Sequence, residues 1–232
     1  MKILYRIADF GYKKEKPNYI NNRECLKNAT DVFCFDCEWT VIADNVSQET
    51  TAMILGFQSN IEHVSVGHGA GTFNLALDKA LSFDDDEIVY FLENDYLHLD
   101  GSVEAIQEGL SFGDYATLYD HPDKYWEPMF GGNPLCHGAS EKTRVYCGKQ
   151  SHWKITNSTT MTFASRVKTL KEDEVILRRW TEGSHPHDFE MFIDLADKGR
   201  TLVSPIPSLS THGETKFLAP LINWGQTTRT LL

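Results

Sequence analysis

An apolar run ends abruptly in three side chains that carry oxygen atoms. Residues 88–92 are apolar, and Glu93, Asn94 and Asp95 follow them directly. Glu93 and Asp95 are two positions apart, so an extended chain directs both carboxylates to the same side. Hard divalent cations such as Mg²⁺ and Mn²⁺ prefer such oxygen ligands and often share them with substrate phosphates. The triplet therefore predicts a metal site for a phosphorylated ligand. A polar turn at the end of a buried strand is the alternative.

A glycine-rich turn precedes this segment. Gly67, Gly69 and Gly71 come just before a helical pattern over residues 72–81. Their spacing is G-x-G-x-G, so the third glycine is not at the position that the dinucleotide-binding fingerprint G-x-G-x-x-G requires. The motif therefore does not indicate NAD. A glycine-rich turn that opens a helix lets the backbone approach a diphosphate and offer it N–H groups. An ordinary strand-to-helix turn explains the same residues equally well.

Strands and helices are both needed to position the acidic triplet and the glycine-rich turn. Apolar runs alternate with helical patterns through the first half of the chain, which is typical of an α/β sheet with crossover helices. The predicted strands there are residues 2–8, 31–35, 40–44, 61–66, 87–92 and 115–119. The predicted helices are residues 21–28, 48–58, 72–81 and 102–110. Because ligands of such sheets bind outside the carboxyl ends of the strands, residues 93–95 are in a suitable place.

The second half of the chain has a different pattern. A turn-rich stretch at 121–140 is followed by β-type runs at 143–147 and 153–163, then by predicted helices at 171–181 and 188–198. Residues 202–220 contain three prolines, and they predict a loop that returns toward the site rather than a packed element.

Composition narrows the class of protein. The 232 residues are 41% hydrophobic and 12% aromatic, which fits one domain with one sizeable core. The net charge of -11 argues against a nucleic-acid partner, and it means that an anionic ligand needs local cations or a metal. No run approaches the roughly 20 apolar residues of a membrane span, so we expect no transmembrane segment. Together with five cysteines that form no dense framework, this predicts a cytoplasmic protein.

The order of these motifs resembles that of the GT-A glycosyltransferases, in particular the small single-domain enzymes of large DNA viruses and of bacteria. The resemblance covers nearly the whole chain and implies a Rossmann-type mixed α/β sheet flanked by helices, in a single domain of residues 1–232. Residues 1–110 would form the nucleotide-sugar-binding half, and residues 111–232 the acceptor-binding half with a C-terminal metal loop. The implied substrates are a nucleoside diphosphate sugar, with a UDP-sugar as first choice, and a glycan or other hydroxyl acceptor. The implied cofactor is Mn²⁺ or Mg²⁺.

The resemblance also implies which residues bind the donor. In the family, the first strand and its loop contact the nucleotide base, and a later strand ends at the base or ribose. A glycine-containing run then leads to the metal motif. The residues that correspond to these parts are Arg6, Asp9, Asp44, Gly69, Asn74, Glu93 and Asn94.

The metal ligands follow from the same resemblance. The family's metal motif corresponds to residues 93–95, with glutamate in place of the usual first aspartate. This departure makes Asp95 the direct ligand and gives Glu93 a water-mediated role. Family enzymes also bring a histidine from a C-terminal loop to the metal, and His212 matches it. Considered alone, His212 would be an ordinary loop histidine.

The family's third element is an acidic residue that opens a helix on the acceptor side. Asp188 takes that place, and it could accept a proton from an acceptor hydroxyl. An N-cap of the same helix is the alternative role. His185 and His187 suggest a second alternative, a zinc site that includes Asp188.

Two other functions are compatible with these motifs. A sugar nucleotidyltransferase also combines an α/β fold with a nucleotide and a divalent ion. Such enzymes carry a glycine-rich basic loop directly after the first strand, whereas residues 9–14 of this chain contain one glycine. A non-catalytic domain that binds a nucleotide or a glycan is the third possibility.

Overall fold

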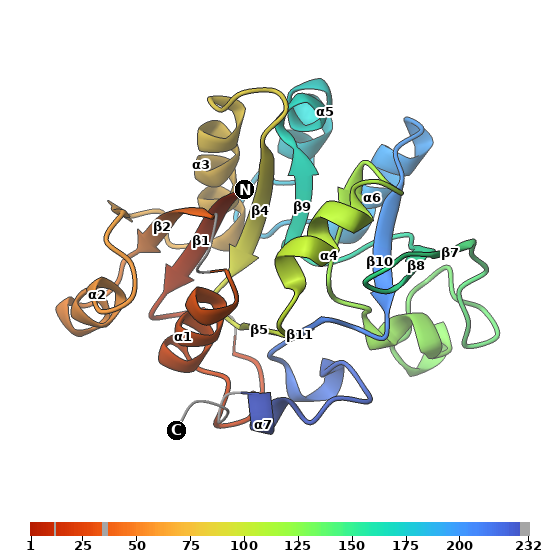
Figure 1. Cartoon of the computed structure of the whole chain (residues 1–232), viewed down its shortest axis with the longest axis horizontal. Coiled ribbons are helices and arrows are strands. Elements are labelled where there is room, and N and C mark those ends of the chain that lie inside the picture. The colour runs from red at the N-terminus through yellow and green to blue at the C-terminus, as the bar shows by residue number, and fades with distance from the viewer. Residues whose placement is uncertain (12, 34–36, 228–232) are drawn as a thin grey trace.

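A nine-stranded mixed sheet runs through the centre of the molecule (Figure 1). The computed structural model describes residues 1–11, 13–33 and 37–227. The strand order is β3-β2-β1-β4-β9-β6-β10-β8-β7. The strands are β1 (Lys2–Ala8), β2 (Glu38–Asp44), β3 (Ile61–Val64), β4 (Ile88–Glu93), β6 (Tyr115–Ala116), β7 (Val145–Cys147), β8 (His152–Ile155), β9 (Phe163–Arg166) and β10 (Leu202–Ile206).

The N-terminal strands form the parallel part of the sheet. Strands β3, β2, β1 and β4 pair in parallel, so their carboxyl ends meet at one edge. Strand β9 joins β4 in antiparallel orientation, and β10 pairs in parallel with β6 and antiparallel with β8. The predicted Rossmann-type mixed sheet in a single domain is therefore confirmed.

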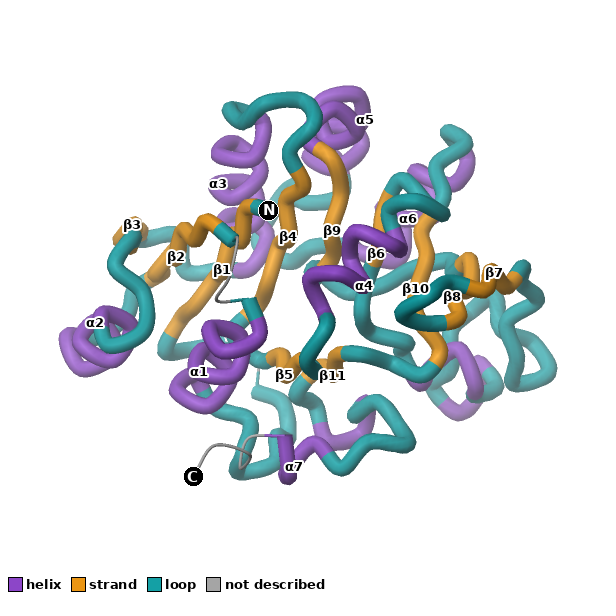
Figure 2. Tube along the Cα trace, viewed as in Figure 1, coloured by secondary structure: helices purple, strands orange, loops and turns teal. Residues whose placement is uncertain are grey.

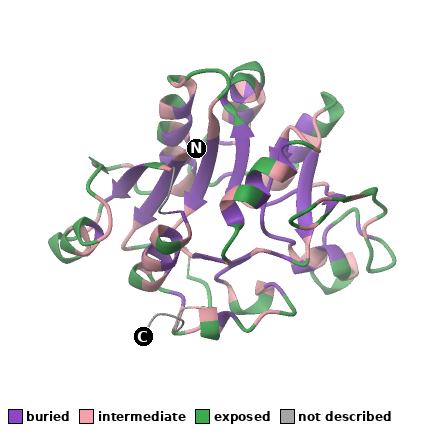
Figure 3. Ribbon diagram, in the orientation of Figure 1, coloured by how far each residue is buried: buried purple, intermediate pink, exposed green. Residues whose placement is uncertain are grey.

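Helices cover both faces of this sheet (Figure 2). Alternate strand residues point to opposite faces, so Tyr5 and Tyr90 belong to one core while Leu4 and Phe91 belong to the other. The first core is covered by α1 (Asn22–Val32), α2 (Gln48–Leu55) and α4 (Ser102–Gly109), and the second by α3 (Gly69–Leu81), α5 (Val167–Arg179) and α6 (Asp188–Asp197). Figure 3 shows buried strands between helices whose outer sides are exposed. None of the described helices is long and apolar enough to cross a membrane.

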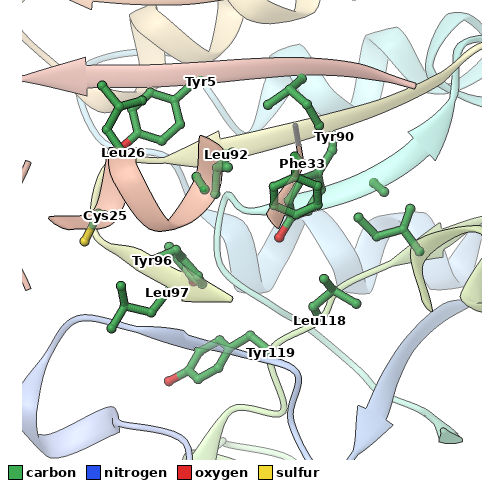
Figure 4. Close-up of a cluster of buried hydrophobic side chains, with 14 of the residues drawn as sticks. Tyr5, Cys25, Leu26, Phe33, Tyr90, Leu92, Tyr96, Leu97, Leu118 and Tyr119 are labelled. Carbon is green, nitrogen blue, oxygen red and sulfur yellow. The ribbon is translucent and has the colours of Figure 1, made fainter. Parts of the chain in front are cut away.

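A second, two-stranded sheet lies beyond the carboxyl end of β4. Strand β5 (Tyr96–His98) follows β4 after a two-residue turn and pairs in antiparallel orientation with β11 (Ser210–His212). The side-chain amide of Asn28 in α1 bonds both the N–H and the carbonyl of His98, at 2.7 and 3.0 Å. Figure 4 shows Tyr96 and Leu97 of β5 within the first core, together with Tyr90 of β4. Helix α1 and the core therefore fix β5, and β11 docks on it.

The predicted loop at residues 202–220 is wrong in its first part. Residues 202–206 form β10, an interior strand of the large sheet, and residues 210–212 form β11. Pro205 is tolerated because the pairing with β6 ends at Val203. Beyond that point β10 has a ladder partner on one side only, so a missing N–H can face the other side.

The predicted strand at residues 31–35 is also wrong where the structure describes it. Asp31 and Val32 are the last residues of α1, and residues 34 and 35 lie outside the described part of the chain. Cys25, Leu26 and Ala29 line the buried face of α1. Their spacing of one, three and four positions continues the helical period into residues 31–32. The predicted strand at 115–119 is shortened to the two residues of β6.

Candidate functional site

A cavity of about 540 Å³ opens at the carboxyl ends of β1, β2 and β4. The turn before α3, Ser184 and a segment that follows β1 form further walls. Most of the residues predicted to bind a donor or a metal line this cavity, and Asn74 and Asp188 do not. The predicted residues that line it are Arg6, Asp9, Asp44, Gly69, Glu93, Asn94, Asp95 and His212.

Asp95 and His212 converge in this cavity although they are far apart in the sequence. The pairing of β5 with β11 places His212 opposite Tyr96, the residue after Asp95. His212 Nε2 lies 3.3 Å from Asp95 Oδ2, and both side chains are largely buried. Burial alone would raise the pKa of Asp95, but His212 and Lys16 outweigh it and hold this pKa well below its usual range. An ionised carboxylate therefore faces an imidazole nitrogen at neutral pH.

Gly213 makes the close approach of these two groups possible. A Cβ atom at position 213 would lie 2.3 Å from Cγ2 of Ile20 and 2.8 Å from the carbonyl oxygen of Asp95. Both distances are shorter than van der Waals contact. A larger residue after His212 would therefore push the end of β11 away from Asp95.

Two lysines of residues 13–17, which we name the lysine arm, reach the same point. Lys16 Nζ donates a hydrogen bond to Asp95 Oδ2 at 2.9 Å. Lys14 Nζ lies 3.3 Å from His212 Nε2 and 3.7 Å from Glu214 Oε2. Both predicted metal ligands therefore have an ammonium group beside them.

Arg6 is buried beneath the cavity and holds its floor together. Its guanidinium donates to the carbonyl oxygens of Gly69 at 3.2 Å and Met161 at 2.9 Å. Its Nη2 also lies 3.4 Å from Oε1 of Glu93. Glu93 therefore faces Arg6, whereas Asp95 and His212 face each other.

The donor atoms at this point fit a divalent ion with two protein ligands. In the part of the chain that the structure describes, no group of three or more His, Cys, Asp or Glu side chains is arranged to hold a metal. Among the described residues, Glu93 is therefore not placed as a third ligand beside Asp95 and His212. His185, His187 and Asp188 are not arranged as the alternative zinc site either. A carboxylate oxygen and an imidazole nitrogen 3.3 Å apart can occupy adjacent positions on one Mn²⁺ or Mg²⁺ ion. Substrate phosphates and water commonly supply the other ligands of such ions.

Asp44 organises the turn that leads into α3. Its oxygens accept hydrogen bonds from the N–H groups of Val66 at 2.7 Å and Gly67 at 2.8 Å. Gly67 has a φ of 82°, a left-handed conformation that favours glycine. His68 then caps α3 by accepting an N–H of its first turn at 3.0 Å. The turn thus presents the N-terminal end of α3, including Gly69, to the cavity.

Three other residues that were predicted to bind the donor form hydrogen bonds within the protein. Asp9 accepts a backbone N–H at 2.7 Å and a hydroxyl at 2.6 Å at the start of α2. Asn94 donates to the carbonyl of Ala8 at 3.2 Å, which ties the end of β4 to that of β1. Asn74 donates to the carbonyl of Thr181 at 3.1 Å and joins α3 to the end of α5. The polar atoms of Asn74 therefore connect helices outside the cavity lining.

Asp188 lies at the start of α6, close enough to Glu93 for their charges to interact. It is the first residue of the helix, and His187 occupies the N-cap position without a side-chain cap. One oxygen of Asp188 accepts the N–H of Phe189 at 2.8 Å. Burial and the charge of Glu93 raise the pKa of Asp188 to about 6, against the opposing effects of Phe189 and Lys124. This carboxyl group can therefore exchange a proton near neutral pH.

Several residues of the cavity were not predicted from the motifs. These are Lys14 and Lys16, together with His68 and Asn22. The lysines had a signal in the sequence, because Lys13, Lys14 and Lys16 form a basic run directly after the first strand of an acidic protein. His68 and Asn22 had no such signal in the sequence, since a polar residue at the start of a helix most often only caps it.

Comparison with known proteins adds evidence about the fold. No family profile and no curated protein sequence matches this chain. GalNAc-T7 crystallised with UDP, GalNAc and Mn²⁺ is a similar solved structure, with a TM-score of 0.54 at 9% identity over 91% of this chain and 43% of that one. The galactosyltransferase LgtC, crystallised with donor and acceptor sugar analogues, has a TM-score of 0.46 at 13% identity over 84% and 69% of the two chains. A nucleotidyl transferase from Methanothermobacter has a TM-score of 0.48 at 9% identity over 88% and 85%.

The architecture and the similarity to GalNAc-T7 define the class of fold. Parallel strands β3, β2, β1 and β4, the antiparallel strand β9 and helices on both faces are arranged as in a GT-A domain. The chain has a GT-A-like fold, as the order of its motifs predicted.

Proposed function

We propose that the chain is a metal-dependent glycosyltransferase that moves a sugar from a nucleoside diphosphate sugar to a hydroxyl of a glycan or another acceptor. A UDP-sugar is our first choice of donor. The observation that carries this proposal is the convergence of Asp95 and His212 at the carboxyl end of β4, in the cavity of about 540 Å³. Ligands of open α/β sheets bind outside the carboxyl ends of the strands, and the cavity lies at this edge.

The charges of the cavity support a diphosphate that binds together with a metal ion. Arg6, Lys14 and Lys16 line the cavity and offer cations to the phosphates, and a divalent ion would offset the carboxylates that also line it, Asp9, Asp44, Glu93 and Asp95. Asp95 and His212 would hold the Mn²⁺ or Mg²⁺ ion. A divalent ion in that position stabilises the negative charge that develops on a departing diphosphate. The N-terminal end of α3 adds backbone N–H groups and the positive end of a helix dipole.

Asp188 is proposed to accept or orient the proton of the acceptor hydroxyl. It lies at the start of α6, outside the cavity lining but close enough to Glu93 for their charges to interact. With a pKa of about 6, most of this carboxyl is ionised at neutral pH, yet it is a stronger base than an ordinary aspartate. The division into a donor half at residues 1–110 and an acceptor half at residues 111–232 is part of the same proposal.

The test is a screen of nucleoside diphosphate sugars for release of the diphosphate. Wild-type protein is incubated with UDP-, GDP- and ADP-sugars in the presence of Mn²⁺, Mg²⁺ or EDTA, with and without simple sugars as acceptors. We expect release from one donor type with Mn²⁺ or Mg²⁺ and little release with EDTA. Asp95→Ala should lose most of the metal-dependent gain in donor affinity, measured by calorimetry. Asp100→Ala changes an exposed aspartate just beyond β5 and is the matched control.

Equal metal-dependent affinity in wild type and Asp95→Ala would refute the metal assignment. A complete absence of nucleotide binding, with the protein still folded, would refute the proposed function itself.

The basic lysine arm favours one second candidate, a sugar nucleotidyltransferase. Such an enzyme uses cations directly after the first strand to bind a triphosphate. The two reactions differ in their products, because a nucleotidyltransferase joins a nucleoside triphosphate to a sugar phosphate and releases pyrophosphate. Release of pyrophosphate from UTP and sugar 1-phosphates would favour this candidate over transfer to a hydroxyl.

A further inference from the structure

The ammonium groups of the lysine arm stand where a metal ion would bind. A cation held by both Asp95 Oδ2 and His212 Nε2 would have to contact both of these atoms. Lys16 Nζ is 2.9 Å from the first atom, and Lys14 Nζ is 3.3 Å from the second. A divalent ion and these ammonium groups cannot share the same ligand atoms, because their charges repel and their volumes overlap.

The backbone of the arm is anchored at Glu15, and its two lysine side chains are partly exposed. The carbonyl of Glu15 accepts two hydrogen bonds from Thr215, from the N–H at 2.8 Å and from the hydroxyl at 3.0 Å. Lys14 and Lys16 flank this anchored residue in the sequence, and both of them line the cavity. About a third of each lysine side chain is exposed, at 33% and 32%. Each ammonium group can therefore move on its flexible stem while Glu15 stays in place.

A lysine displaced by the metal can pair with another anion, and a diphosphate would supply one. The carboxylates beside the arm are Asp95, which the metal would take, and Glu214, 3.7 Å from Lys14. Both lysines line the same cavity as the turn before α3, where the phosphates are proposed to bind. Lysine is a common phosphate ligand because its compact charge has three rotatable donors.

We infer that Lys14 and Lys16 form an exchangeable cation pair. Before the donor binds, they occupy Asp95 and His212. When the metal takes these two ligands, the lysines move onto the diphosphate. This inference rests on the proposed function, because it requires a diphosphate ligand. It assigns the lysines a dual role, in which they weaken the binding of metal alone and strengthen the binding of metal with nucleotide.

Two titrations test this dual role, because the expected effects have opposite signs. Calorimetry first measures Mn²⁺ alone, and then the tightest-binding of UDP, GDP and ADP at a fixed Mn²⁺ concentration. For Lys16→Ala we expect Mn²⁺ alone to bind about tenfold more tightly, and the nucleotide about tenfold more weakly, on the usual scale for a charged hydrogen bond. Lys14→Ala should show the same pattern. Lys16→Arg keeps the charge and should restore both affinities toward wild type.

Lys13→Ala is the matched control, since Lys13 belongs to the same arm but does not line the cavity. It should leave both affinities unchanged. Unchanged or weaker Mn²⁺ binding in Lys16→Ala would refute the occupation of the metal position, and unchanged nucleotide affinity would refute the transfer to the diphosphate. If the wild type binds none of the nucleotides, the proposed function and the transfer both fail. The titration with Mn²⁺ alone then still tests whether the lysines compete with a metal ion for Asp95 and His212.

Discussion

Asp188 differs from Asp95 in the direction in which its surroundings shift its pKa. Asp95 has a histidine and a lysine beside it, and its pKa is held low. Asp188 is affected mainly by burial and by Glu93, and its pKa is raised to about 6. The two carboxyl groups therefore have different properties at neutral pH. This difference suits a metal ligand in one case and a base in the other.

The proposed role of Asp188 predicts a large loss of transfer in Asp188→Asn. The amide can still accept the N–H of Phe189, but it is not a base. We expect transfer to the acceptor to fall about 10²-fold with donor affinity nearly unchanged, and wild-type transfer to rise with pH through about 6. Initial rates between pH 5 and 8 and a donor titration measure these effects. Near-wild-type transfer by a folded Asn variant would return Asp188 to a structural role at the start of α6.

The same shift predicts how stability depends on pH. Since the pKa of about 6 in the folded chain exceeds the value near 4 of an unfolded aspartate, the folded chain holds this proton more tightly. The contribution of Asp188 to stability is therefore fully present below pH 4 and is lost as the pH rises through 6. At pH 8 Asp188→Asn should be more stable than wild type by about 1 kcal/mol, after allowing for partial exposure. Urea unfolding at pH 4.5 and pH 8 should show the gain shrinking at the lower pH.

The pairing of β5 with β11 is short, yet it positions one of the two proposed metal ligands. It is the connection that brings His212 from the C-terminal segment to the end of β4. Strand β5 is fixed by Asn28 and by the buried aromatic side chains of Figure 4. Strand β11 is therefore positioned by a rigid partner, as a precisely held ligand requires.

Gly213→Ala should disturb this element at one point. The added Cβ would clash with Ile20 and with the backbone of Asp95, so the end of β11 has to shift. We expect His212 to move away from Asp95 and Mn²⁺-dependent nucleotide affinity to fall about tenfold. Asp100→Ala is the control, because Asp100 is exposed and does not line the cavity. Calorimetry with both variants checks this, and equal affinities would show that the approach at Gly213 is not needed for binding.

The elements show where reasoning from sequence succeeds and where it stops. The strand that ends at Glu93 was predictable because an apolar run and a polar stop are both local signals. Strand β10 was missed because Pro205 argues against a central strand, and only the sheet order shows that one side of β10 is free there. The engagement of Glu93 with Arg6 was missed for a related reason. A spacing of two positions tells which side of a strand a carboxylate faces, and says nothing of the cation on the neighbouring strand.

At the scale of the whole molecule, a buried ion cluster joins separate segments of the second half of the chain. Lys154 of β8 is almost fully buried, with Nζ 2.8 Å from Asp120 Oδ1 and 3.0 Å from Glu141 Oε2. Within the described residues, these two oxygens accept no hydrogen bond that would replace the ion pairs. The cluster links β8 to both ends of the long turn-rich segment.

Lys154→Met should therefore be strongly destabilising. The change keeps an apolar stem but leaves two buried carboxylates without their cation, which typically costs about 3–5 kcal/mol. Urea unfolding at pH 7 measures the loss. Lys142→Met alters an exposed lysine next to Glu141 and should change stability by less than about 0.5 kcal/mol. A Lys154→Met loss as small as that of the control would show that water compensates the two carboxylates.

The docking of β11 on β5 also fixes when the site can exist during the life of the protein. A ribosome joins Arg6 and Asp95 to the growing chain well before it reaches His212. A nascent chain that still lacks β11 can assemble β1, β2 and β4, yet it holds only one of the two proposed metal ligands. Such a chain has no second ligand with which to retain a cation, and its Lys16 can still pair with Asp95. The pairing that brings His212 to Asp95 therefore forms late in synthesis.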